Sequence, residues 1–258
     1  MAREGMAEPQ VIDEHLVCLH APASYEAEQY RTLAHTIELM RKDTGLRVLA
    51  VTSAMAGDGK TTTAINLAAA LAQSSEARVI LVCADLRRPS VIEHLGMEYP
   101  HLVGLSTAIQ NPAYTLTQVA ESLQRNLSVL SAGPCPDNPY EVLKSPRLGE
   151  LLQEARQHYD YIVVDTPPLL LVPDWQVIAK WVDGFLMVVG AHKTPRRLVE
   201  EALNLMDPSR LVGLVFNYDD RALSGYYYYY YTSGQPPAHH GQNWWRRLAT
   251  TLGRVFSR

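Results

Sequence analysis

Cysteine is scarce in this sequence, and long apolar runs are missing. The 258 residues include only three cysteines, Cys18, Cys83 and Cys135, at scattered positions. An odd, scattered set indicates reduced thiols and argues against a disulfide framework or a cysteine-based metal site. No uninterrupted apolar stretch reaches the roughly 18 residues that a membrane-spanning helix needs. The start of the chain is polar and acidic, which is not typical of a signal peptide. We therefore expect a cytoplasmic protein.

Positive charge is not in excess either. The chain has 23 lysines and arginines against 27 aspartates and glutamates, so its net charge is −4. No bulk basic charge indicates nucleic acid as a partner. The nine histidines show no spacing typical of metal ligands, and the G-x-S-x-G nucleophile motif of hydrolases is absent. The composition thus points away from nucleic-acid binding, from metalloenzymes and from serine hydrolases.

What the sequence does contain is an alternation of apolar strands and helical segments. Apolar residues make up 47% of the chain, enough for the core of one α/β domain. Short runs rich in Val, Ile and Leu predict buried strands at 47–53, 78–84, 127–131, 161–165, 185–190 and 211–217. Helical patterns fall at 26–42, 59–73, 90–95, 139–158, 174–181 and 194–206. Such alternation predicts an α/β fold with a doubly wound, mostly parallel sheet flanked by helices.

Composition changes along the chain predict four segments. Residues 1–24 lack a clear period and are expected to form a loose leader, and residues 25–218 hold the α/β domain. Residues 219–243, which are rich in Tyr and then in Gly, Pro and His, have too little apolar surface to fold alone. Residues 244–258 combine tryptophans and aliphatic residues with arginines. That pattern predicts an amphipathic helix on anionic lipid or on a membrane partner, with a helix folded back on the domain or a frayed tail as the alternatives.

A phosphate-binding loop is predicted between the strand 47–53 and the helix 59–73. The segment reads SAMAGDGKTTT, and its glycines allow successive backbone N–H groups to face phosphate oxygens at a helix N-terminus. In such a P-loop, Lys60 would reach the phosphates of ATP and Thr61 would ligate Mg²⁺. Ala54 replaces the usual first glycine, and a chance glycine turn is the weaker alternative. The expected nucleotide contacts are Ala56, Gly57, Asp58, Gly59, Lys60, Thr61 and Thr62.

Two further strands end in aspartate. Asp85 follows the strand 78–84, and Asp165 ends the strand 161–165. Ligands of open α/β sheets bind where the strands end, so both carboxylates are candidates for holding Mg²⁺ or positioning a nucleophile. Asp85 could instead pair with Arg87 or Arg88, and Asp165 could cap a turn. Arg87 is a candidate phosphate contact, with helix capping as its alternative.

Six consecutive tyrosines stand near the C-terminus: Tyr226, Tyr227, Tyr228, Tyr229, Tyr230 and Tyr231. A buried strand would use three of them on one face and expose the rest. The flanking Gly and Ser residues favour a mobile tail whose tyrosines accept phosphate. Several phosphates of about −1.5 to −2 charge each would repel one another strongly. An aromatic strand or stacking surface is the alternative.

The P-loop, the Asp-Leu-Arg-Arg-Pro strand end, the YIVVDTPP strand and the tyrosine run together resemble the bacterial tyrosine kinases of capsule and exopolysaccharide export. The resemblance implies a P-loop NTPase that uses Mg-ATP to phosphorylate its own C-terminal tyrosines in trans, with Lys60, Asp85 and Asp165 in catalysis. It also implies a homo-oligomer and a transmembrane polysaccharide co-polymerase as activator. The protein would then lie at the inner membrane through that partner.

Three positions depart from the patterns of related families. Cys83 stands where the kinases carry the first of two aspartates, and a largely neutral thiol is a poor substitute for a carboxylate. An ATP-binding scaffold with little or no transfer is therefore the alternative function. Glu28 and Arg31 match the family's oligomer-interface signature, but Ala34 replaces its second arginine. A third hypothesis is a partitioning ATPase of the same fold. Met55 disfavours it, because those ATPases carry an extra lysine at this position.

Overall fold

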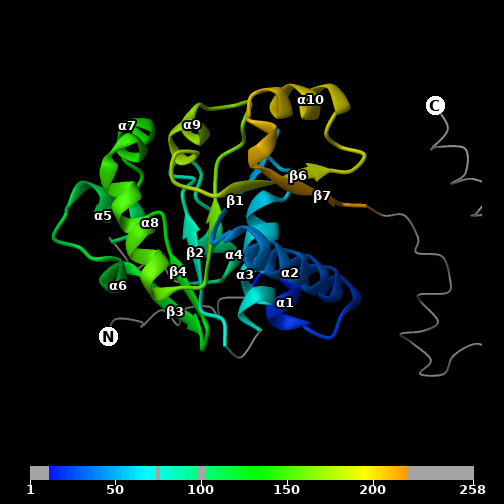
Figure 1. Ribbon diagram of the computed structural model, residues 1–258, viewed down its shortest axis with the longest axis horizontal. Helices are drawn as coiled ribbons and strands as arrows, with labels where there is room; N and C mark the ends of the chain where they lie inside the picture. The colour runs from blue at the N-terminus through cyan, green and yellow to red at the C-terminus, as the bar shows by residue number, and fades with distance from the viewer. Residues whose placement is uncertain (1–11, 74–75, 98–102, 220–258) are drawn as a thin grey trace, which may run out of the picture. The chain divides into compact units, whose positions relative to one another are not determined.

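A seven-stranded sheet forms the centre of the computed structural model, which describes residues 12–73, 76–97 and 103–219 (Figure 1). The strand order is β3-β4-β2-β5-β1-β6-β7. All neighbouring pairs are parallel except β3 and β4, which are antiparallel. The predicted mostly parallel, doubly wound α/β sheet is confirmed. The strands are β1 (Val48–Ser53), β2 (Val79–Cys83), β3 (Glu121–Gln124), β4 (Leu127–Leu130), β5 (Tyr161–Asp165), β6 (Gly184–Gly190) and β7 (Leu211–Asn217).

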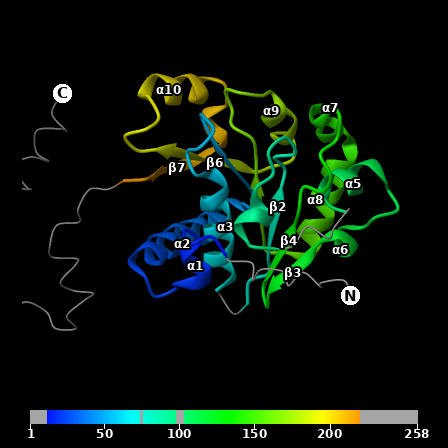
Figure 2. The same cartoon turned by 180° about the vertical axis from the view of Figure 1, so that it is seen from behind.

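Helices cover both faces of the sheet, because its central strands are apolar on both sides. Every residue of β1, β2, β5 and β6 is buried. The helices α1 to α4 gather on one side and α5 to α8 on the other (Figures 1 and 2). The helices are α1 (Val17–His20), α2 (Tyr25–Thr44), α3 (Lys60–Ala72), α4 (Val91–His94), α5 (Leu105–Gln110), α6 (Leu116–Val119), α7 (Pro139–Lys144), α8 (Pro146–His158), α9 (Asp174–Ile178) and α10 (Arg196–Asn204), with a 3₁₀ turn at Pro208–Arg210.

The position of β5 brings three strand ends together. β5 lies between β1 and β2, and it is parallel to both. In this register Asp165 is opposite Val51 of β1 and opposite Cys83 of β2. The carboxyl ends of the three strands therefore meet at one edge of the sheet, where ligands of such folds bind.

The sequence predicted one helix over 139–158, and the structure corrects this to two. Ser145 separates α7 from α8, with a ψ of 136° that no α-helix allows. The cause is Pro146, which lacks an N–H and disfavours helical geometry in the residue before it. The Ser145 side chain then accepts the N–H of Arg147 and caps α8. Pro146 is thus a local sequence signal for the break between the two helices.

Residues 12–24 are folded, so the prediction of a loose leader over 1–24 is wrong for this part. Leu16 is fully buried and Cys18 nearly so. The Cys18 N–H donates to Asn66 Oδ1 of α3 at 2.9 Å, and Asn66 Nδ2 donates to the His15 carbonyl at 2.9 Å. One asparagine side chain thus fixes the segment on α3, a contact that no local pattern reveals.

Smaller elements also differ from expectation. The sequence did not predict α5, α6 and the edge strand β3, which have four to six residues each. α9 ends at Ile178 and α10 at Asn204, before the expected ends at 181 and 206. The tyrosines 226–231 and the terminal segment 244–258 lie outside the described residues. Within the described residues, no helix is long and apolar enough to cross a membrane.

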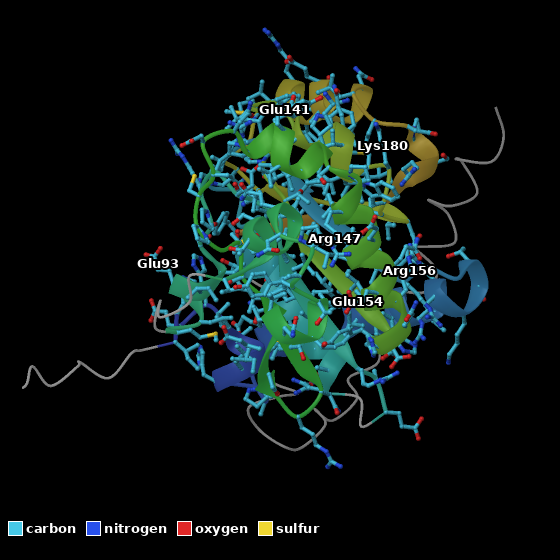
Figure 3. The ribbon with its side chains drawn as sticks, turned by 90° about the vertical axis from the view of Figure 1, so that its left-hand side faces the viewer. Glu93, Glu141, Arg147, Glu154, Arg156 and Lys180 are labelled. Carbon is cyan, nitrogen blue, oxygen red and sulfur yellow. The ribbon has the colours of Figure 1, made fainter. Side chains whose placement is uncertain are left out.

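Arg147, Glu154 and Arg156 lie along α8 (Figure 3), and each contacts a part of the chain that is distant in sequence. Arg147 Nη2 donates to the Tyr114 carbonyl at 2.9 Å, and Glu154 Oε1 accepts the N–H of Leu116 at 3.0 Å. Arg156 Nη2 donates to Asp183 Oδ1 at 2.6 Å. These contacts join α8 to the start of α6 and to the residue before β6.

Replacing Asp183 by asparagine is expected to lower the free energy of unfolding by about 1–2 kcal/mol at neutral pH. Its carboxylate accepts the N–H groups of Arg47 and Val48 at 2.8 Å as well as the Arg156 guanidinium. Partial burial raises the pKa of Asp183, but these hydrogen bonds lower it more. A lowered folded-state pKa stabilises the protein above the unfolded pKa, and this contribution disappears as pH falls through the folded value.

Urea unfolding of both proteins from pH 7 to pH 3 measures this effect. The difference in the free energy of unfolding between wild type and Asp183→Asn should shrink as the pH falls. The exposed Asp137→Asn is the matched control and should leave stability unchanged at both ends of the range. A difference that stays constant with pH would contradict the assignment.

Candidate active site

The loop between β1 and α3 has the backbone shape that a phosphate site requires. Gly57 and Gly59 have φ values of 83° and 88°, in the left-handed region that favours glycine. A Cβ at Gly59 would lie 1.9 Å from Asn217 Nδ2, so no other residue fits there without displacing Asn217. α3 begins directly after this turn and runs for 13 residues. Its free N–H groups and dipole face the loop.

Lys60 lies between the two predicted carboxylates. Its Nζ is 3.1 Å from Asp85 Oδ2 and 3.7 Å from Asp165 Oδ1. The side chains of Lys60, Asp85 and Asp165 are only 12%, 4% and 1% exposed. Burial lowers the pKa of Lys60, but the charges of Asp165 and Asp85 raise it more, so the net pKa lies above its usual value. The ammonium therefore stays charged, as phosphate binding requires.

Thr61 and Asp165 form the part of the site that suits a magnesium ion. The Thr61 hydroxyl donates to Asp165 Oδ2 at 2.9 Å. Asp165 Oδ1 is buried and has no hydrogen-bond partner. A carboxylate oxygen without a hydrogen bond, beside a threonine hydroxyl and a second carboxylate, fits a hard cation with oxygen ligands. Among the described residues, no three His, Cys, Asp or Glu side chains gather into a metal site of their own. Mg²⁺ is typically held by one or two carboxylates together with the substrate's phosphates.

Cys83 is buried at the same edge, directly opposite Asp165 in the β2–β5 register. Burial raises the pKa of its thiol far above the usual range, and the carboxylates of Asp165 and Asp85 raise it further. The thiol is therefore neutral. It can neither accept a proton nor ligate Mg²⁺ as an aspartate at this position would.

The Arg87 guanidinium pairs with Asp174, whereas Asp85 contacts only the backbone of Arg87. Asp85 Oδ1 accepts the backbone N–H groups of Arg87 and Arg88 at 3.3 and 3.0 Å, while its other oxygen faces Lys60. The Arg87 guanidinium makes a bidentate contact with buried Asp174, at 2.8 and 2.9 Å. These hydrogen bonds raise the pKa of Arg87. Asp174 thus fixes a cation at the cavity wall, a role that the sequence did not indicate.

A cavity of about 590 Å³ opens above these residues. Its wall includes every predicted nucleotide contact except Asp58, namely Ala56, Gly57, Gly59, Lys60, Thr61, Thr62 and Arg87. Of the two predicted metal-binding carboxylates, Asp85 lines the cavity and Asp165 does not. The wall also includes residues outside the predicted set of contacts: Arg88, Ser90, His94, Pro167, Pro168, Leu171, Val172 and Tyr218. Pro167 and Pro168 follow Asp165 and Thr166 in the DTPP motif. This motif indicates that both prolines lie near the site.

The side chain of Asp58 does not line the cavity, although Asp58 was a predicted nucleotide contact. Its carboxylate is buried, accepting the Met55 N–H at 3.2 Å and the Thr194 hydroxyl at 2.5 Å. The Asp58 side chain therefore stabilises the shape of the loop through contacts outside the cavity. Of Asp58, the backbone N–H is the group that a loop of this kind would offer to a phosphate.

The predicted interface residues Glu28 and Arg31 contact each other within α2. Arg31 also donates to the Pro22 carbonyl and, at 2.9 Å, to Gln73 Oε1. About a third of each side chain remains exposed. Both residues thus have partners within the chain and still reach the surface.

Comparison with known proteins agrees with this geometry. Residues 46–221 match the family model described as ParA: NUBPL iron-transfer P-loop NTPase. The protein named tyrosine-protein kinase YwqD from Bacillus subtilis (strain 168) is 35% identical over 208 residues, covering 80% of this chain and 86% of that protein. The chain belongs to the bacterial tyrosine kinases.

Other bacterial tyrosine kinases share both the sequence and the fold. The kinase domain of Escherichia coli tyrosine kinase ETK superposes with a TM-score of 0.72 at 27% identity, covering 86% of this chain and 88% of that one. The succinoglycan biosynthesis transport protein ExoP of Rhizobium meliloti (strain 1021) is 32% identical over 79% of this chain, which corresponds to 26% of its own length. Within the ParA-like P-loop fold, the chain thus groups with the tyrosine kinases, as its sequence motifs predict.

Proposed function

We propose that the protein transfers the γ-phosphoryl group of Mg-ATP to tyrosine, with its own residues 226–231 as acceptors. In this way it would regulate exopolysaccharide or capsule synthesis and export. The observation that carries the proposal is the charged Lys60 held between Asp85 and Asp165 beside the glycine loop. Membership of the tyrosine kinases and the tyrosine run support it.

Each residue of the cluster has a distinct part in this reaction. Lys60 and the loop amides would bind the phosphates, and Thr61, Asp85 and Asp165 would hold Mg²⁺. The bound Mg²⁺ would supply charge neutralisation for the phosphates. The acceptor Oη forms a bond to the γ-phosphorus while the bond to the β,γ-bridging oxygen breaks, and ADP leaves. Because the Cys83 thiol is neutral, we assign acceptance of the tyrosine proton to Asp85, which lines the cavity.

Cys83 supports a second candidate function. With a buried thiol in place of a carboxylate, the protein would bind ATP and assemble with a membrane polysaccharide co-polymerase while transferring little phosphate. In both cases we propose a cytoplasmic protein that reaches the inner membrane through a transmembrane partner. We also propose a homo-oligomer that uses Glu28 and Arg31, and a surface contact through residues 244–258.

Phosphotyrosine detection after incubation with Mg-ATP separates the two functions. The assay includes the cytoplasmic segment of the activating partner and compares wild type with a variant whose residues 226–231 are all phenylalanine. Kinase function predicts a signal in wild type that the phenylalanine variant loses. Tyr140→Phe, outside the run, is the control and should keep the signal. ATP binding without any phosphotyrosine in wild type would support the scaffold and reject the kinase.

A further inference from the structure

Lys193, which is far from the phosphate loop in sequence, contacts this loop from outside the cavity. Lys193 follows β6 in the turn that leads to α10, and its Nζ donates to the Gly57 carbonyl at 2.6 Å. The two residues are 136 positions apart. A Cβ on Gly57 would come within 3.0 Å of this ammonium, so the lysine lies close against the loop. Lys193 is not part of the cavity wall, and no motif of the sequence indicates it.

Asp58, the next residue of the loop, is also held by side chains that are distant in sequence. Thr194 donates its hydroxyl proton to Asp58 Oδ1 at 2.5 Å. Asn217 Nδ2, at the end of β7, donates to the Asp58 carbonyl at 3.1 Å. Two consecutive loop carbonyls, those of Gly57 and Asp58, are therefore bound by side chains of other elements.

Holding a carbonyl also fixes the amide on the other side of the same peptide plane. The peptide unit is planar and trans, so its C=O and N–H point in opposite directions. The Gly57 carbonyl shares its plane with the Asp58 N–H, and the Asp58 carbonyl with the Gly59 N–H. Successive amides of this kind bind phosphate only when they converge. The glycine freedom that permits the loop shape also allows these planes to rotate.

We propose that Lys193 is a positioning residue for nucleotide binding, because it locks the Gly57–Asp58 peptide in the phosphate-binding orientation. The lysine acts through the loop carbonyl and not on the phosphates themselves. Its ammonium also lies 5.3 Å from the centre of the Tyr218 ring, which lines the cavity, so it joins the loop to the end of β7. The proposal rests on the assignment of the cavity as a nucleotide site.

Calorimetric binding of ATP and of ADP, each with Mg²⁺, tests this role. Lys193→Met should weaken both nucleotides by the same factor, about fivefold, because a charge-assisted hydrogen bond at an exposed position contributes only part of its full strength. Lys193→Arg, which can still donate to the carbonyl, should recover most of the affinity. Lys180→Met removes an equally charged residue that contacts no part of the loop and should bind as wild type does.

Hydrogen exchange in the nucleotide-free protein provides a second measurement. The amides of Asp58 and Gly59 should exchange faster in Lys193→Met, while those of β1 should not change. Unaltered affinity and exchange would overturn the proposal. A loss confined to ATP would also overturn it, because it would indicate direct contact with the γ-phosphate. If wild type binds neither nucleotide, the nucleotide-site assignment fails, and the exchange result still decides whether Lys193 holds the loop.

Discussion

Replacing Lys60 with methionine is expected to weaken Mg-ATP binding by at least about 100-fold and to abolish phosphoryl transfer. The ammonium is the cation between Asp85 and Asp165, 3.1 and 3.7 Å away. Without it, two buried carboxylates would face the incoming phosphates with no positive charge between them. The free energy of unfolding should also fall, by about 3 kcal/mol, because one partner of a buried ion cluster is lost.

Acid should reduce this loss of stability. Burial raises the pKa of Asp165, and the charge of Lys60 holds it lower than it would otherwise be. In Lys60→Met the pKa of Asp165 rises further, and a raised folded-state pKa favours the folded protein at low pH, until pH exceeds that pKa. Calorimetric titration with Mg-ATP and thermal unfolding between pH 5 and pH 8 measure both effects. Lys42→Met, at an exposed position of α2, is the control, and affinity within threefold of wild type would refute the role of Lys60.

Replacing Cys83 with aspartate is expected to lower the free energy of unfolding by about 3 kcal/mol without nucleotide, and to raise phosphoryl transfer about tenfold with Mg-ATP. The new carboxylate would be the third in a buried cluster that contains one lysine, because Asp165 and Asp85 already raise the pKa of the thiol at this position. Bound Mg²⁺ would offset part of the added negative charge, so the stability cost of this carboxylate should shrink when Mg-ATP is present.

Cys83→Ser is the matched control, since it changes the atom at this position without adding charge. Thermal unfolding with and without Mg-ATP, together with phosphotyrosine formation, measures the two effects. If Cys83→Asp is as stable as wild type, residue 83 does not share the electrostatic environment of Asp165. If Cys83→Asp and Cys83→Ser form phosphotyrosine at the same rate, the missing carboxylate does not limit phosphoryl transfer.

The parts of this site that a sequence can predict are those encoded locally. Val-rich runs identify buried strands, and the ends of parallel strands meet at one edge, so Lys60, Asp85 and Asp165 could be placed together in advance. The neutral character of Cys83 also followed from residue type, and burial strengthens it. The Tyr226–Tyr231 acceptors remain a prediction, because they lie outside the described residues.

The contacts that support the site could not be predicted because they depend on side chains from remote elements. Asp174 holds Arg87 from 87 positions away, and Asn217 reaches the loop from 159 positions away. The folded segment before α2 depends on Asn66, which is 48 residues from Cys18. No periodicity or motif encodes such pairs. Pro146, in contrast, was a local signal that should have ended the helix over 139–158.

The distant origin of the loop's supports has a consequence for how the protein folds. The side chain of Asp58 is held by Thr194 and its carbonyl by Asn217, so the loop is supported by residues 136 and 159 positions further along the chain. Contacts of such high sequence separation are characteristic of slow folding, because a long chain must be ordered before they form. During synthesis, the glycine loop leaves the ribosome early but gains its support only after β7 has been made. The phosphate loop is therefore expected to be among the last features of the domain to be completed, so ATP should stabilise the domain only after β7 has been made.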